Sequence, residues 1–191
     1  MKTRMIILSS VLAAAITLAG CTPASWVTEA EGIAQVALPI VQGVATIVGA
    51  GPAVTQAVSD VNLLIKLFEQ YQAAPATGTL QQIQAALNAA NADIAQIEAA
   101  AGIKNAATQS KVAAILQLVT SEFSSIAGLI PTATPAPAGQ AATAKAVVLA
   151  PKLNGKLPFT AKQFKEQYNK IVSTQTGDAQ CDLAFAGKEI K

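Results

Sequence analysis

The sequence TLQQIQAALNAANADIAQIEAAAG, residues 79–102, decides the fold that we expect for this chain. Its apolar residues recur at alternating intervals of three and four, which places them on one stripe of an α-helix. The stripe consists of Leu80, Ile83, Leu87, Ala90, Ile94, Ile97 and Ala101. Thr79 and Gln82 have the spacing of a capping box, and Gly102 is a stop signal. This segment therefore predicts a helix whose long apolar seam packs against another helix.

Two neighbouring segments supply partners for this seam. After a short turn around Lys104 and Asn105, a second helix is predicted to run to Ile130. Its apolar face consists of Val112, Ile115, Leu116, Val119, Phe123, Ile126 and Ile130. A helix from Pro52 to about Tyr71 has a stripe of Val54, Val58, Val61, Ile65 and Phe68. Short connections favour antiparallel neighbours, so we predict an all-α fold with an antiparallel bundle of about four helices in residues 26–130.

Residues 32–59 contain no charged side chain, and this segment fits two interpretations. A buried core helix has apolar side chains on most of its faces, as this segment does. A membrane-inserting hairpin has the same composition. Gln35, Gln42 and the mid-segment Pro39 argue against a span, so we favour a core helix that is kinked or broken at Pro39.

The C-terminal third has a different composition. Residues 131–158 are rich in Pro, Ala and Thr and predict a linker, and residues 159–191 predict one further helix followed by a loose tail. Thr160 and Gln163 have capping-box spacing at the start of that helix. Its apolar side consists of Phe164, Tyr168, Ile171 and Val172, and the tail holds Cys181, Leu183 and Phe185. Because this part is basic and residues 21–130 are acidic, we expect the helix to rest on the bundle.

The N-terminus has the pattern of an export signal. Lys2 and Arg4 precede an uncharged run that closes with LAGC at residues 18–21, so residues 1–20 predict a signal peptide. The LAGC sequence resembles the lipobox of bacterial lipoproteins, and the resemblance covers only this N-terminal part of the chain. It implies cleavage before Cys21 and attachment of a diacylglycerol to that cysteine, with residues 21–25 as a tether.

The lipobox resemblance also implies a location. Two or more acyl chains on Cys21 would anchor the chain firmly to a membrane. In a double-membraned cell, Thr22 after the cysteine would favour the outer membrane, with the bundle facing the periplasm. Cys181 would then be a lone thiol. Without acylation, a disulfide between Cys21 and Cys181 is the alternative.

The composition argues against several functions. The chain has no histidine, and its single arginine, Arg4, lies in the signal peptide, so we expect no nucleic-acid binding. No nucleotide, hydrolase or metal-binding motif is present, and we predict no catalytic residues, no cofactor and no metal site. Five acidic residues of the bundle, Asp60, Glu69, Asp93, Glu98 and Glu122, are assigned to solvated helix faces, without a close carboxylate pair of the glycosidase type.

These observations predict a lipid-anchored cell-envelope protein that is not an enzyme. Its bundle would act by binding or scaffolding, through a protein partner or through self-association of helical faces. The alternative is a membrane-inserting or pore-type protein that uses residues 32–59.

Overall fold

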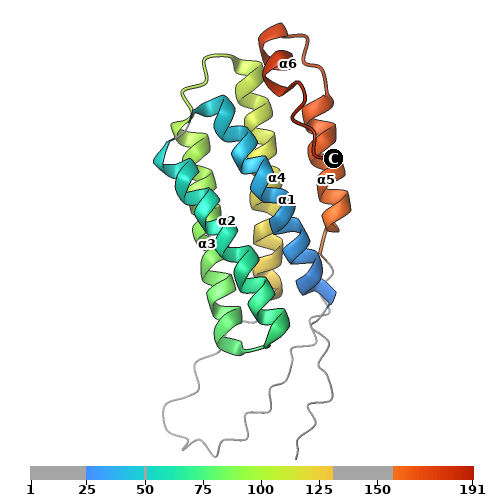
Figure 1. Cartoon of the computed structure of the whole chain (residues 1–191). Helices are drawn as coiled ribbons and strands as arrows, with labels where there is room; N and C mark the ends of the chain where they lie inside the picture. Colours follow the sequence, from blue (N-terminus) through green and yellow to red (C-terminus); the bar gives the residue numbers. More distant parts are fainter. Residues whose placement is uncertain (1–24, 50, 131–156) are drawn as a thin grey trace, which may run out of the picture.

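The computed structural model describes residues 25–49, 51–130 and 157–191, and every element in these ranges is helical (Figure 1). The elements are α1 (Ser25–Val48), α2 (Pro52–Ala73), α3 (Thr77–Ala100), α4 (Ala106–Leu129), α5 (Ala161–Ser173) and α6 (Ala179–Phe185). The predicted all-α class is confirmed. The predicted signal peptide, Cys21 with most of its tether, and residues 131–156 of the predicted linker lie outside the described residues.

The four long helices form the predicted antiparallel bundle. They alternate in direction along the chain (Figure 1). α1 packs on α2, α2 on α3 and α3 on α4, and α4 returns to contact α1. The ring encloses one apolar core that includes Ile33, Phe68, Leu87 and Phe123, all of them fully buried.

Helix α1 is continuous through Pro39, so the break that the sequence allowed does not occur. Pro39 and Gln35 are both exposed. The carbonyl of Gln35, which loses its helical hydrogen bond to the proline, therefore faces water. The opposite side of α1 supplies Trp26, Val27, Ala30, Ile33, Ala34, Ala37, Ile40, Val41 and Val44 to the core. Residues 32–48 of the uncharged segment thus belong to a helix that packs on the core, and residues 52–59 form the start of α2.

The buried face of α2 differs from the predicted stripe. Ala57 and Leu64 are fully buried, whereas Val58 and Ile65, which the sequence pattern placed in the stripe, are half-buried. The core side of α2 consists of Val54, Ala57, Asp60, Val61, Leu64, Leu67 and Phe68. Because alanine can fill a close helix contact, the true seam runs through Ala57 rather than through the larger Val58.

The seams of α3 and α4 follow the prediction, but one predicted cap is wrong. α3 begins at Thr77 with Ala76 as its N-cap, so Thr79 is a buried residue inside the helix and forms no capping box. α3 ends at Ala100, shortly before Gly102. α4 begins with Asn105, whose side chain accepts a hydrogen bond from the Thr108 backbone N–H at 2.8 Å. Both helices bury their predicted apolar residues from Leu80 to Ile97 and from Val112 to Ile130.

We call residues 157–191 the C-terminal arm. Its helix α5 lies along α1 and α4, and the predicted capping box of Thr160 and Gln163 is present. The predicted loose tail is wrong, because α6 forms there, with Asp178 as its N-cap, and buries Cys181 and Phe185. Leu183 faces solvent.

The arm is held to the bundle by hydrogen bonds and apolar packing. Glu29 Oε2 of α1 accepts from the Ala161 backbone N–H at 3.0 Å, and Lys188 Nζ donates to Thr46 Oγ1 at 2.8 Å. Asn105 Nδ2 donates to Asp178 Oδ2 at 2.9 Å. The only ion pair among the described residues, Lys162 with Glu166, lies within α5 itself. Among the described residues, the expected attraction between the basic arm and the acidic bundle therefore does not produce ion pairs between them.

The arm approaches α1 closely at Gly32. A Cβ atom on this residue would lie 2.8 Å from the Cβ of Ala161. We expect Gly32→Ala to lower the free energy of unfolding by about 1–3 kcal/mol, because neither small side chain can move aside. Urea unfolding measures the change. Gly43→Ala is the matched control in the same helix, since its Cβ would meet only the Tyr168 hydroxyl at 3.8 Å, and equal losses in the two variants would contradict this prediction.

Candidate functional site

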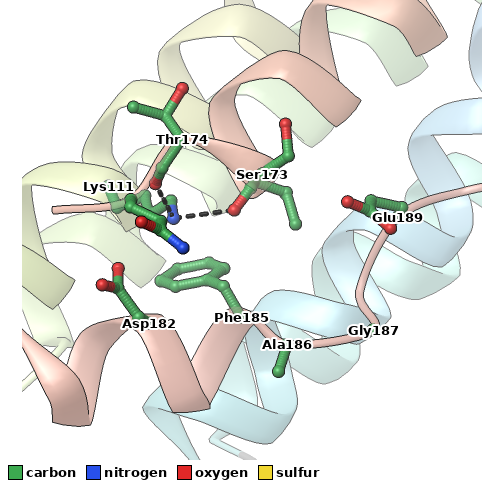
Figure 2. A pocket seen from close by; sticks show the side chains of 10 residues that line it. Lys111, Ser173, Thr174, Asp182, Phe185, Ala186, Gly187 and Glu189 are labelled. Carbon is green, nitrogen blue, oxygen red and sulfur yellow. Dashed lines mark hydrogen bonds between the residues drawn. The ribbon is translucent and has the colours of Figure 1, made fainter.

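A polar cavity of about 190 Å³ lies where the arm meets the end of the bundle (Figure 2). Helix α4 contributes Lys111, and the remaining lining comes from the arm. Those residues are Val172, Ser173, Thr174, Gln175, Asp182, Phe185, Ala186, Gly187 and Glu189. The cavity therefore depends on the docked position of the arm.

Lys111 is the central polar group of this cavity. Only 7 % of its surface is exposed. Its Nζ donates to the backbone carbonyls of Val172 at 2.7 Å and Thr174 at 2.8 Å, at the C-terminal end of α5. The same atom lies 4.7 Å from the centroid of the Phe185 ring (Figure 2). A cation at a helix C-terminus is stabilised by the helix dipole. Lys111 thus joins α4, α5 and α6 in one contact.

Two carboxylates near this cavity, those of Asp182 and Asp178, are occupied by local contacts. Asp182 Oδ1 accepts from the backbone N–H and the hydroxyl of Thr176, both at 2.9 Å. The backbone hydrogen bond, with a smaller effect of Lys111, lowers the pKa of Asp182. Asp178 Oδ1 accepts from the Cys181 backbone N–H at 2.9 Å, which lowers the pKa of Asp178. Both groups stabilise the turn before α6 in their charged form.

Glu122 of α4 is fully buried, so its assignment to a solvated helix face was wrong. Neither of its carboxylate oxygens has a hydrogen-bond partner within the described part of the chain. Burial without a compensating partner disfavours the charged form and raises the pKa of Glu122 to about 7. A carboxyl group in this environment changes its charge near neutral pH.

A second buried carboxyl group lies between α2 and α3. Asp60 of α2 is buried, and its Oδ2 has no hydrogen-bond partner among the described residues. Burial, followed by the neighbouring Asp93, raises the pKa of Asp60, while Gln56 Nε2 donates to its Oδ1 at 3.3 Å. Two adjacent carboxyl groups share a proton more readily than they both ionise. The assignment of Asp60 to a solvated helix face was therefore wrong, whereas Glu69 and Glu98 are exposed as expected.

The remaining sequence candidates form no reactive site in the structure. Cys181 is a buried free thiol on α6. Among residues 25–49, 51–130 and 157–191, no three His, Cys, Asp or Glu side chains are grouped so that they could hold a metal ion. The predicted lipidation residue, Cys21, lies outside the described residues, so its modification stays a prediction.

Two described helices, α1 and α4, are long and apolar enough to cross a membrane. Length and composition alone give this result, and core helices of soluble proteins meet the same criteria. Both helices supply apolar side chains to the core of the bundle. Comparisons of the chain with protein-family models, curated proteins and solved structures found no match.

Proposed function

We propose that this chain is a lipid-anchored cell-envelope protein whose helical bundle binds or scaffolds other molecules without catalysing a reaction. The observation that carries the anchor is the position of LAGC, residues 18–21, relative to the fold. The first helix begins at Ser25, so acyl chains on Cys21 would attach the bundle to a membrane by one end through a very short tether.

The use of the ionisable side chains supports binding rather than catalysis. Lys111 donates to two carbonyls, Asp178 caps α6, and Asp182 accepts two hydrogen bonds from Thr176. A general acid or base needs to reach a substrate with a free proton-carrying group. Lys111 instead holds α4 against the end of α5, and the two aspartates stabilise the turn before α6.

Metabolic labelling with an azide-bearing fatty acid tests the anchor. We expect the full-length protein to incorporate the label and to fractionate with membranes. Cys21→Ala should lose the label, because the thioether can form only on that cysteine, and Cys181→Ala should keep it. Equal labelling of the protein and of Cys21→Ala would refute the proposed lipidation.

The second candidate function is membrane insertion through residues 32–59, favoured by the absence of charge there and by the length of α1. The burial of Ile33, Ala37, Ile40 and Val44 against other helices supports the core assignment instead. Alkaline carbonate separates the two functions when it is applied to Cys21→Ala. Release into the supernatant is expected for a core helix, and retention in the membrane would favour insertion.

A further inference from the structure

Helix α4 carries two ionisable side chains on one stripe beneath the C-terminal arm. The stripe contains Lys111, Ile115, Glu122 and Ile126, all of them buried. Their spacing of four, seven and four residues keeps them on one side of the helix. Because Lys111 donates to carbonyls at the end of α5, this side of α4 faces the arm.

The register of α4 and α5 places Glu122 near the start of α5. The two helices run in opposite directions (Figure 1), and Lys111 is level with Val172. Glu122 follows Lys111 on α4 by as many residues as Val172 follows Ala161 on α5. Because the rise per residue is the same in both helices, Glu122 is level with Ala161. Ala161 in turn lies against Gly32 of α1. Glu122 is therefore buried in the region where α1, α4 and α5 meet.

Helix α5 of the arm is shorter than the four long helices and buries fewer side chains than any of them. α5 has 13 residues, whereas α1 to α4 have 22–24 residues each. Only Phe164, Tyr168 and Val172 of α5 are buried. Elements with few buried apolar contacts open locally before the whole domain unfolds.

We propose that the C-terminal arm is a proton-controlled latch, closed over Glu122 when its carboxyl group is protonated and lifted when the carboxylate forms. On opening, the proton passes to water, and the carboxylate gains the hydration that it lacks under the arm. Opening also uncovers apolar side chains of α1 and α4 that the arm covers.

The pKa of Glu122, about 7, places this switch near neutral pH, and burial is its cause. The charged residues of the elements packed around α4 do not shift it. These residues are Glu29 and Glu31 of α1, Asp93 and Glu98 of α3, Lys162, Lys165, Glu166 and Lys170 of α5, and Asp182 of α6. The latch therefore depends on the desolvated position of Glu122 and not on an ion pair.

Amide hydrogen exchange of the full-length protein in detergent, read by mass spectrometry and corrected for intrinsic rates, tests the latch. Between pH 6 and pH 8 we expect the population with an open arm to rise about tenfold, because the closed state holds the proton more tightly than the open state does. Exchange in α5 should rise accordingly, while exchange in α2 and α3 stays constant. The rate of alkylation of Cys181, which is buried on α6, reports the opening of that helix. This rate is compared between variants at the same pH.

Glu122→Gln should remove the rise between pH 6 and pH 8 in both readouts, and Glu122→Leu should keep the arm closed at both pH values. The proposal is overturned if the wild-type protein and Glu122→Gln respond equally to pH. It is also overturned if exchange in α2 and α3 rises as much as in α5, because the whole domain would then be opening. A rise confined to the first turn of α5, with Cys181 still protected, would contradict release of the arm.

Discussion

Replacing Glu122 with leucine should raise the free energy of unfolding by about 3 kcal/mol at pH 8. The native protein buries this carboxyl group completely and gives it no hydrogen-bond partner within the described residues. Leucine has a similar volume and needs no hydration, so it removes the cost of keeping an ionisable group in the core. At pH 4.5 the same replacement should have a much smaller effect, because the carboxyl group is then largely protonated in the folded protein.

The sign of this pH dependence follows from the direction of the pKa change. Folding raises the pKa of Glu122 from 4.5 to about 7, so the folded state binds the proton more tightly than the unfolded state does. The contribution of Glu122 to stability is therefore greatest below about pH 4.5 and is lost as the pH rises through 7. Burial also raises the pKa of Asp60, so the contribution of Asp60 to stability falls with rising pH as well.

Asp178 and Asp182 act in the opposite direction. Their hydrogen bonds with backbone N–H groups lower both pKa values, so the stability that they supply is lost under strongly acidic conditions. Together these groups predict that the protein is most stable near pH 4–5. Urea unfolding between pH 3 and pH 9 measures this curve, and a maximum above pH 7 would contradict it.

The matched control for Glu122→Leu is Glu69→Leu. Glu69 lies on α2 and is exposed, so the same chemical change there should alter the free energy of unfolding by less than about 0.5 kcal/mol at either pH. If the two variants behave alike, the buried position of Glu122 is not the cause of the stabilisation.

The spacing of apolar residues in α4 is consistent with a buried position for Glu122. Counting three and four alternately from Val112 leads through Ile115 and Val119 to Glu122 and then to Ile126. A pattern of hydrophobicity favours the apolar neighbour, Phe123, and therefore places Phe123 rather than Glu122 in the predicted seam. Both residues are buried, since α4 contacts α1 and α5 on one side and α3 on the other.

The preference for large apolar side chains also explains why the predicted contact surface of α2 differs from the observed one. Val54, Ala57, Val61, Leu64 and Phe68 follow a regular alternation of three and four, yet Val58 is more hydrophobic than Ala57 and drew the predicted stripe toward itself. In an alanine-rich chain, close helix contacts are made by small residues that carry little hydrophobic signal. The all-α class and the approximate extents of the long helices were predictable because they depend on period, turns and breakers.

The cavity around Lys111 was not predictable from the sequence. Its lining joins α4 to residues of the arm that follow a long connecting segment, and no local pattern specifies that contact. In the sequence, nothing distinguishes Lys111 from a lysine on an exposed helix surface. Its role becomes visible only in the structure, where it donates to the carbonyls of Val172 and Thr174. The capping box of Thr160 and Gln163, by contrast, involves neighbouring residues only, and the sequence predicted it correctly.

Replacing Lys111 with methionine should lower the free energy of unfolding by about 2–4 kcal/mol. Methionine keeps the apolar stem of the side chain but removes the ammonium group. The carbonyls of Val172 and Thr174 then lose their hydrogen-bond donor, and the contact with the Phe185 ring disappears. Because these partners all belong to the arm, we expect α5 and α6 to detach while the four-helix bundle remains folded.

Limited proteolysis combined with urea unfolding measures both effects. In Lys111→Met, cleavage within residues 161–185 should become faster, and a fragment that contains α1 to α4 should persist. Lys66→Met is the control, because Lys66 is exposed on α2 and the same replacement there should leave the cleavage pattern unchanged. If the arm of Lys111→Met stays as resistant to protease as that of the wild-type protein, the apolar residues Phe164, Tyr168, Val172 and Phe185 hold it without the ammonium group. In that case Lys111 is not the residue that joins the arm to the bundle.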